Sequence, residues 1–479
     1  MARVGRRVAR FELEDAWLVD PVAGREGRAA LLVEDGTIAA VDWRRGSSVP
    51  ALLVLPGLFD LHAHLRQPGG EDAESVASGL AAAAHGGFTT VCQMANTEPA
   101  VADAAAVHEA YRLAQASGSP VRLLAWGATT AGRAGSGLAP MAALAEAGAI
   151  GVSDDGSPLD DPALLRQALL YAGSLGLVVT EHAEDRALTA GAEADEGLAA
   201  TILGLRGWPA AAEVGAVARA LAVLDEVVRE APRGCRPRLH LTHLSTAGAV
   251  AAVRAAKAAG LPVTADVTPH HLALTDGWLG GDRRFAWQVG GRPWSGEPAE
   301  APPYDTACRV NPPLRGADDA AALAAGLADG TIDAIATDHA PHREVDKAVE
   351  FGAAANGISG LETALGLVLA AVEAGVLELA VAARALAMGG AAVLGRELPG
   401  PREGVPADLV VVDRAADWTV TEAALRSRGR NTPLLGRRLP GRVLATLAGG
   451  RFAYLDAELE AELEAGRARG DGAPARSRR

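Results

Sequence analysis

The sequence predicts an α/β chain, with a (β/α)₈ barrel of the TIM type beside a small β-domain built from both chain ends. Between residues 56 and 399, short apolar runs alternate about eight times with alanine-rich helical stretches, as in a parallel βα repeat. Each run ends in polar, often ionisable residues, which is typical of barrels with an active site at the carboxyl ends of the strands. Strand-like sequence returns at both ends of the chain.

The domain boundaries follow from these changes along the chain. Residues 1–55 and 400–457 form the predicted β-domain, with Asp35–Gly36 marking a hairpin turn in the first segment. Residues 56–399 form the barrel. The stretch 275–308 is rich in Gly, Pro and Trp and is expected to be a surface loop insert, where a lid could form. The tail 458–479 is charged, then rich in Gly, Arg and Ser, and is expected to be disordered.

Composition excludes several functional classes. The chain has 479 residues and a net charge of −14, which argues against nucleic-acid binding. No apolar run is long and clean enough to span a membrane, and the N-terminus lacks the apolar core of a signal peptide. The three cysteines, Cys92, Cys235 and Cys308, are too few and too scattered for a disulfide framework. We therefore expect a cytoplasmic enzyme that uses neither nucleic acid nor membrane as a partner.

The stretch DLHAHLRQPG, from Asp60 to Gly69, is the most informative one in the chain. It places His62 and His64 two residues apart at the end of an apolar run, and alternate residues of a strand share a face. Two imidazoles on one face can bind one divalent metal ion. Arg66 follows in the same alternation, so a positive charge is expected beside the metal. This pattern indicates an anionic substrate next to a Lewis acid.

Further ionisable residues stand at the other predicted strand ends. A single strand-end histidine is more often a packing or capping residue than a ligand, but the barrel brings all the strand ends into one ring. Four or five nitrogen and oxygen ligands with a spare carboxylate would hold one or two divalent ions and activate water. The set comprises His62, His64, Asp154, Asp155, His182, His240, His243, His270, His271, Asp338, His339 and His342.

A series of motifs resembles the amidohydrolase superfamily and, within it, the bacterial class I dihydroorotases. The resemblance covers roughly Pro56 to Tyr454. Few unrelated sequences would carry these motifs in this order. They are PGLFDLHAHLRQPG, GGFTTVCQMANTEP, SDDG, EHAED, HLTHLST, VTPHHL, RVNPPLR, IDAIATDHAPH, GISGLET and GRNTP.

The resemblance implies an activity and a set of roles. The activity is the reversible cyclisation of N-carbamoyl-L-aspartate to L-dihydroorotate in pyrimidine biosynthesis, with Zn²⁺, one or two ions per subunit. A homodimer is implied, and an association with aspartate transcarbamoylase is left open. The implied metal ligands are His62, His64, His182 and His243, with Asp155 between the metals and Asp338 as both ligand and proton carrier. The implied substrate contacts are Arg66, Asn96 and His342 to the carboxylate, and Asn311, Asn356 and Gly357 to the ring.

The lysine content bears on the metal bridge. Hydantoinases and allantoinases of this superfamily are typically bridged by a carboxylated lysine. The chain contains only Lys257, within a helical stretch, and Lys347, beyond the DHAPH motif. Neither occupies a strand end, so a carboxylate must bridge. The SDDG motif supplies one, and the family pattern favours Asp155, with Asp154 as support.

Two other functions compete with this interpretation. The first is a different cyclic amide or ureide hydrolase, of the hydantoinase or allantoinase type. The missing bridging lysine and the carboxylate-binding set count against it. The second is a non-catalytic dihydroorotase-like partner of aspartate transcarbamoylase. Such chains typically lose one or more metal ligands, whereas all of them are present here.

Overall fold

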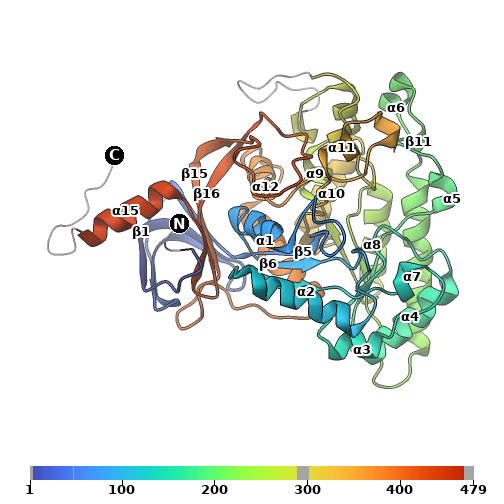
Figure 1. Ribbon diagram of the computed structural model, residues 1–479, viewed down its shortest axis with the longest axis horizontal. Coiled ribbons are helices and arrows are strands. Elements are labelled where there is room, and N and C mark those ends of the chain that lie inside the picture. Colours follow the sequence, from blue (N-terminus) through green and yellow to red (C-terminus); the bar gives the residue numbers. More distant parts are fainter. Residues whose placement is uncertain (1–3, 47, 289–300, 469–479) are drawn as a thin grey trace.

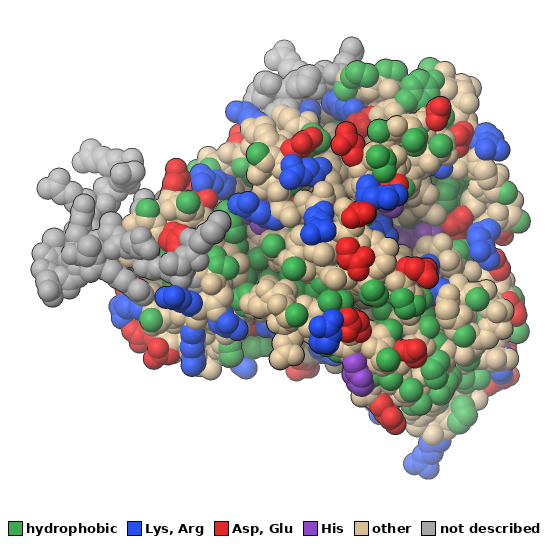
Figure 2. Space-filling model, in the orientation of Figure 1, with side chains coloured by type: hydrophobic (Ala, Val, Ile, Leu, Met, Phe, Trp, Pro, Cys, Tyr) green, Lys and Arg blue, Asp and Glu red, His purple; other side chains and the backbone are tan. Residues whose placement is uncertain are grey.

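The computed structural model describes residues 4–46, 48–288 and 301–468. A mixed β-sheet containing strands from both chain ends lies beside a larger α/β body (Figure 1). Acidic and basic side chains are interspersed over the face shown in Figure 2. Among the described residues, none of the helices is long and apolar enough to cross a membrane.

The mixed sheet has seven strands in the order β17-β16-β15-β4-β1-β2-β3. Their bounds are β1 Arg10–Asp20, β2 Arg25–Glu34, β3 Thr37–Trp43, β4 Leu52–Pro56, β15 Leu409–Thr419, β16 Arg438–Ala448 and β17 Arg451–Leu455. The predicted hairpin is confirmed, because β2 pairs antiparallel with β3 and both Asp35 and Gly36 have positive φ. The exact division into 1–55 with 400–457 and 56–399 stays a prediction.

Within the described residues, eight parallel strands form the barrel. They are β5 Leu58–Ala63, β6 Phe88–Gln93, β7 Arg122–Ala125, β8 Val152–Ser153, β9 Val179–Glu181, β12 Leu239–Leu241, β13 Val263–Val267 and β14 Ala334–Ile335. They pair as β5-β6-β7 and β8-β9-β12-β13-β14. Parallel bridges Gly127–Val152 and Ala63–His339 join the two sets. All six residues of β5 and of β6 are buried, as expected for parallel strands covered on both faces.

Helices follow the strands and cover the barrel. The longer ones are α1 Val76–His85, α2 Ala104–Ser117, α3 Met141–Glu146, α4 Pro162–Ser174, α7 Ala211–Glu230, α8 Ala247–Ala258, α10 Ala317–Asp329, α12 Ala364–Glu373 and α13 Leu379–Arg384. Short connecting elements are α5 Arg186–Thr189, β10 Ala194–Asp195, α6 Leu198–Leu203, β11 Gly207–Trp208, α9 Pro269–Ala273, α11 Glu344–Lys347 and α14 Gly390–Val393. Side chains of Ser75, Asp103 and Asp161 accept hydrogen bonds from the first turns of α1, α2 and α4, which satisfies amides that the helix leaves unpaired.

Two expectations for irregular segments need correction. Residues 275–288 of the 275–308 insert are packed rather than a surface loop, because Trp278 and Phe285 are fully buried in an apolar cluster, whereas Pro302, Pro303 and Tyr304 are exposed, as expected for a loop. Residues 289–300 lie outside the described residues. The tail expected to be disordered from residue 458 begins with helix α15, Ala457–Ala468. Leu459 and Leu463, one turn apart, pack against the core of the mixed sheet, which explains the helix. Residues 469–479 lie outside the described residues.

Candidate metal centre and active site

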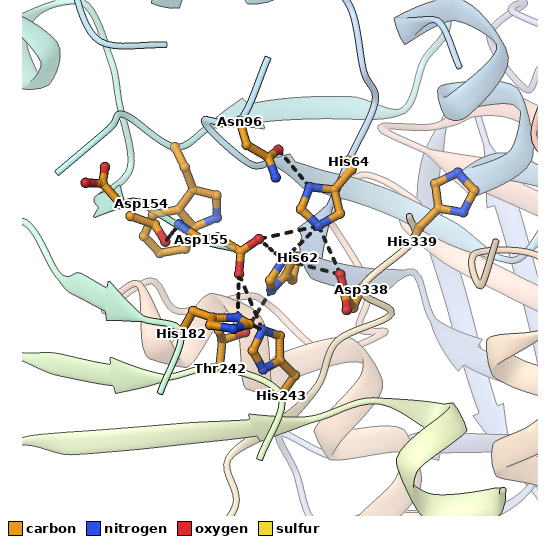
Figure 3. A network of polar contacts seen from close by, with 12 residues as sticks. His62, His64, Asn96, Asp154, Asp155, His182, Thr242, His243, Asp338 and His339 are labelled. Atoms are coloured by element: carbon orange, nitrogen blue, oxygen red, sulfur yellow. Dashed lines mark hydrogen bonds and ion pairs between the residues drawn. The ribbon is translucent and has the colours of Figure 1, made fainter. Parts of the chain in front are cut away.

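The carboxylate of Asp155 lies between two pairs of histidines at the carboxyl ends of the barrel strands (Figure 3). Its Oδ2 is 3.3 Å from His62 Nε2 and 3.5 Å from His64 Nε2. Its Oδ1 is 3.3 Å from His243 Nε2 and 3.6 Å from His182 Nδ1. These residues lie at the end of or directly after different strands, β5, β8, β9 and β12, and all are buried. The structure thus brings together the four histidines and the aspartate that the sequence indicated.

The outer nitrogens of three of these histidines are held by oxygen atoms. His62 Nδ1 is 2.8 Å from Thr242 Oγ1, His64 Nδ1 is 2.8 Å from the Asn96 side-chain oxygen, and His182 Nε2 is 3.1 Å from Glu184 Oε2. A ring that donates its outer N–H presents an unprotonated nitrogen on its inner side. The inner nitrogens converge, since His62 and His64 Nε2 are 3.3 Å apart, and His182 Nδ1 and His243 Nε2 are 2.9 Å apart.

This arrangement fits a bound divalent metal. Each histidine pair forms with Asp155 a group of three ligand atoms close enough to share one ion. Imidazole nitrogens and carboxylate oxygens, oriented by hydrogen bonds from behind, are the usual ligands and supports of such ions. Asp155 belongs to both groups and can therefore bridge two ions.

The electrostatics of the centre favour an ionised carboxylate. Burial alone would raise the pKa of Asp155, but His62, His182 and His243 outweigh this and hold it well below its ordinary value. Burial alone would lower the pKa of His62, but Asp155 and Asp338 raise it to about 9. The centre therefore holds strongly interacting charges in a dry environment, which is common at functional sites.

Asp338 also contacts the pair formed by His62 and His64. Its Oδ1 is 3.0 Å from His64 Nε2 and 3.5 Å from His62 Nε2. Burial opposes ionisation, but the interactions with His62 and His64 lower the pKa of Asp338. The Asp338 carboxylate is therefore ionised at the edge of the metal-capable centre.

Three site residues have an unusual, left-handed backbone conformation. Arg66, His243 and Asp338 have φ of 58°, 38° and 45°, which non-glycine residues rarely adopt. A hydrogen bond from Gln67 N to Leu65 O closes a tight turn around Arg66. The strand alternation expected to continue to Arg66 therefore ends before it, and this left-handed turn directs the arginine to the site. Strain of this kind persists where the surrounding structure enforces it.

Arg66 and His342 lie together. Arg66 Nη2 is 3.3 Å from His342 Nε2, and Arg66 Nε donates to the carbonyl of Pro341 (3.1 Å). His342 Nε2 is 2.7 Å from the carbonyl oxygen of Asn356. Burial and the charge of Arg66 lower the pKa of His342 to about 3, so its ring is neutral at physiological pH.

The other residues expected to contact the substrate do not join the pair formed by Arg66 and His342 in one way, and each has contacts of its own. Asn96 lies against His64, so it also orients a side chain of the metal-capable centre (Figure 3). The Asn311 amide donates to Glu184 Oε2 (3.2 Å), while its own oxygen is buried without a hydrogen-bond partner among the described residues. Asn356 accepts from Arg309 Nε (3.0 Å). Gly357 has φ of 144°, and a Cβ there would lie 3.0 Å from His342 Nε2, so glycine is required.

Strand-end histidines outside the implied ligand set have contacts away from the two ligand groups. His240 Nε2 is 2.8 Å from Asp266 Oδ2, and His271 is held by Thr268 and the carbonyl of Pro312. His339 points away from Asp338 (Figure 3), and its Nε2 is 3.3 Å from Glu74. Asp154 turns outward and accepts from the amides of residues 129 and 130, Oδ1 being 2.8 and 3.1 Å from them.

Several supporting residues were missed by reasoning from the sequence. Asp266, on β13, accepts from the backbone N–H of His243 (2.6 Å) and from Thr242 Oγ1 (3.2 Å), which in turn contacts His62. Glu184 orients His182. A weak signal existed, because Glu184 stands two residues beyond His182 and Thr242 directly precedes His243. Asp266 carries no such signal, because only the pairing of β12 with β13 brings it to the site.

The two lysines lie away from the bridge position. Lys257 Nζ, on α8, is 2.6 Å from Asp333 Oδ2. Lys347 Nζ, on α11, donates to the carbonyl oxygens of Thr306, Arg309 and Ala355. The bridging position between the histidine pairs is taken by the carboxylate of Asp155.

Comparisons with known proteins place these features in a family. A family model described as Dihydro-orotase-like matches residues 51–246. A curated dihydroorotase from Anaeromyxobacter sp. (strain K) is 44% identical over 449 residues, 92% of this chain and 97% of the relative. One from Pelotomaculum thermopropionicum is 43% identical over 450 residues, with the same coverage. Among solved structures, the L-hydantoinase (dihydropyrimidinase) from Arthrobacter aurescens has a TM-score of 0.75 at 23% identity, covering 94% of this chain and 96% of that one.

The dihydroorotase relatives, together with the TIM-type barrel and its metal-capable histidine–aspartate centre, define the class, a cyclic amidohydrolase. Hydantoinases share this fold at low identity, so they establish the fold alone. The named dihydroorotases are more than 40% identical to this chain over nine-tenths of its length, which is a more specific similarity than a shared fold. The chain belongs to the dihydroorotase family.

Proposed function

We propose that this protein is a zinc-dependent dihydroorotase, which interconverts N-carbamoyl-L-aspartate and L-dihydroorotate in de novo pyrimidine biosynthesis. The observation that carries the proposal is the Asp155 carboxylate between two histidine pairs, in a chain 44% identical to named dihydroorotases. The positions of Lys257 and Lys347 count against a hydantoinase or allantoinase with a lysine bridge. The complete ligand set counts against a non-catalytic partner protein.

His62, His64, His182 and His243 would hold one or two metal ions, with Asp155 between them and Asp338 as a further ligand. The predominance of imidazole ligands favours zinc. Bound there, the metal supplies a Lewis acid for the amide carbonyl and water of lowered pKa.

Asp338 would move the proton. In ring opening, a water oxygen bonds to the ring carbonyl carbon, and the carbon–nitrogen bond breaks. Asp338 takes a proton from the water and delivers it to the departing ring nitrogen, acting first as a base and then as an acid. Ring closure is the reverse and releases the water. The low pKa of Asp338 keeps it ionised, and therefore able to accept, at neutral pH.

Arg66, His342 and Asn96 would bind the substrate carboxylate. A guanidinium presents a planar fork of donors that matches a carboxylate, and Arg66 lies beside the neutral ring of His342. Asn311 and the backbone of Asn356 and Gly357 would contact the ring of the substrate. The unpaired oxygen of Asn311 supports this role, because a substrate N–H would satisfy it.

The test is an assay of the purified chain with both substrates, with metal content measured on the same sample. We expect interconversion that a chelator abolishes and zinc restores, and an Asp338→Asn variant that is inactive. Hydantoin and allantoin serve as comparison substrates. Bound metal with turnover of one of these but not of dihydroorotate would refute the proposed substrate. Absence of both metal and turnover would favour the non-catalytic alternative.

The proposal includes a cytoplasmic homodimer that is able to associate with an aspartate transcarbamoylase. All three cysteines are unpaired, which suits a reducing compartment. Light scattering of the chain, alone and mixed with a transcarbamoylase, measures both assemblies. A monomer that does not change mass in the mixture would contradict this part of the proposal.

A further inference from the structure

The connection between β15 and β16 extends from the mixed sheet towards the barrel, red in Figure 1. We call its residues 425–434 the strap. The ends of the strap, Leu425 and Leu434, are buried in the same apolar cluster as Ile358 and Phe351 of the barrel loops. Ser427 Oγ donates to Glu74 (2.5 Å) at the start of α1. The strap is thus anchored on the barrel at both ends and in its first half.

Asn431, in the GRNTP motif of the strap, is buried and uses both ends of its amide. Its Oδ1 accepts from the backbone N–H of His342 (2.8 Å). Its Nδ2 donates to the carbonyl oxygens of Ala340 (3.0 Å) and Gly357 (2.9 Å). Its backbone carbonyl accepts from Ser359 N (3.1 Å). One side chain therefore ties together two barrel loops, the one after β14 and the one around residue 357.

These two loops carry the residues assigned to the substrate. His342 comes from the first, and Asn356 and Gly357 come from the second. They meet at the contact of His342 Nε2 with the Asn356 carbonyl, 2.7 Å apart. The strap itself lies tightly against this point, because a Cβ on Gly429 would be 2.5 Å from Pro341 Cβ and 2.8 Å from His342 N. Only a residue without a side chain fits there.

We infer that Asn431 is a positioning residue for the substrate-binding loops: it fixes His342 against the Asn356–Gly357 backbone without touching the metal centre. The inference rests on the proposed function, since it concerns how the same site holds its substrate. An asparagine suits the task because it presents donors and an acceptor in one plane. Losing these bonds frees both loops, and ordering them again is then a cost of substrate binding.

The experiment compares Asn431→Ala and Asn431→Asp with wild type and with Arg430→Ala. Arg430 is the neighbouring exposed residue of the strap and serves as the matched control. Asn431→Asp keeps the acceptor for His342 N but turns an oxygen towards two carbonyls. We expect both Asn431 variants to raise KM for dihydroorotate about tenfold, with kcat and metal content changed less than about twofold. Arg430→Ala should match wild type.

A double-mutant cycle separates positioning from general stability. In a His342→Ala background, Asn431→Ala should raise KM by clearly less than about tenfold, because one of the two substrate contacts that it positions, the His342 side chain, is gone. An unchanged KM in the single variants would overturn the inference. So would a fall of kcat, metal content and Tm together, or effects that multiply in the cycle. If Asn431→Ala does not fold, the nearly isosteric Asn431→Asp carries the same cycle. An inactive wild type would instead refute the proposed function.

Discussion

Truncation of Arg66 tests how the substrate carboxylate is bound. Arg66 Nε is occupied by the Pro341 carbonyl, which fixes the plane of the guanidinium and leaves its terminal nitrogens beside His342. Burial lowers the pKa of Arg66, with Asp338 and Asp155 opposing this, and an arginine remains charged at neutral pH. The side chain therefore offers a fixed, positively charged fork.

The magnitude follows from the two hydrogen bonds that such a fork can make. A hydrogen bond to a charged group is worth about 1.5–3 kcal/mol. Arg66 is only partly buried, so we take the lower end, about 3 kcal/mol for the pair. This corresponds to a rise in KM of about 100-fold for Arg66→Ala, with kcat nearly unchanged. Arg66→Lys keeps the charge but loses the fork, and should raise KM about tenfold.

The assay is steady-state kinetics in both directions, with metal content measured in parallel. Arg343→Ala is the control, because Arg343 is an exposed arginine next to His342 that pairs with Asp346. An Arg66→Ala variant whose KM is unchanged would refute the assignment. A variant with lowered kcat and lost metal would show that Arg66 supports the metal centre instead.

Three further predictions concern proton transfer, the metal and a buried lysine. Asp338→Asn should lower kcat roughly 10³-fold in both directions while KM changes little. A variant whose KM rises while kcat is unchanged would contradict the proposed role of Asp338 in proton transfer. Removing metal with a chelator should lower Tm in a scanning experiment, since an ion that binds the folded chain stabilises it, and zinc should restore Tm with activity. Burial lowers the pKa of Lys347 to about 8, from 10.5 for an ordinary lysine. The unfolded chain therefore binds more protons between these values, and the contribution of Lys347 to the free energy of unfolding rises with pH from about 8 to 10.5. Denaturant unfolding of wild type and Lys347→Met should show their difference shifting in favour of wild type by up to about 3 kcal/mol over that range, and a pH-independent difference would contradict it.

The helix after the mixed sheet shows where sequence reasoning weighed the wrong feature. The charged composition after residue 458 predicted disorder. Leu459 and Leu463 stand four residues apart, however, and this spacing places both on one helix face that packs on the sheet. Two apolar residues at helical spacing were enough to order the segment because a partner surface was present, and a sequence pattern does not show that surface.

Barrel geometry alone brings together the site residues that come from strand ends. His62, His182, His243, Asp155 and Asp338 converge because parallel strands end on one face of the barrel. The positions of Asn96 and Arg66 depend on loop conformation as well as on barrel geometry. The amide of Asn96 contacts His64, and Arg66 reaches the site through a left-handed turn, because loop backbones after a strand do not continue its alternation.

Residue types and spacing in the sequence predict the chemistry of the centre: histidines and aspartates at the strand ends, and a bridging carboxylate in a chain with only two lysines. Residue types and their spacing along strands are local properties, so they can be read directly. Only the packing of distant segments shows which residues contact the clustered histidines from behind and which join the loops around His342 and Gly357. Asp266 and Asn431 act across sheet pairing and across the contact between the mixed sheet and the barrel. Those contacts exist only once distant segments have packed, and no local pattern encodes the partner.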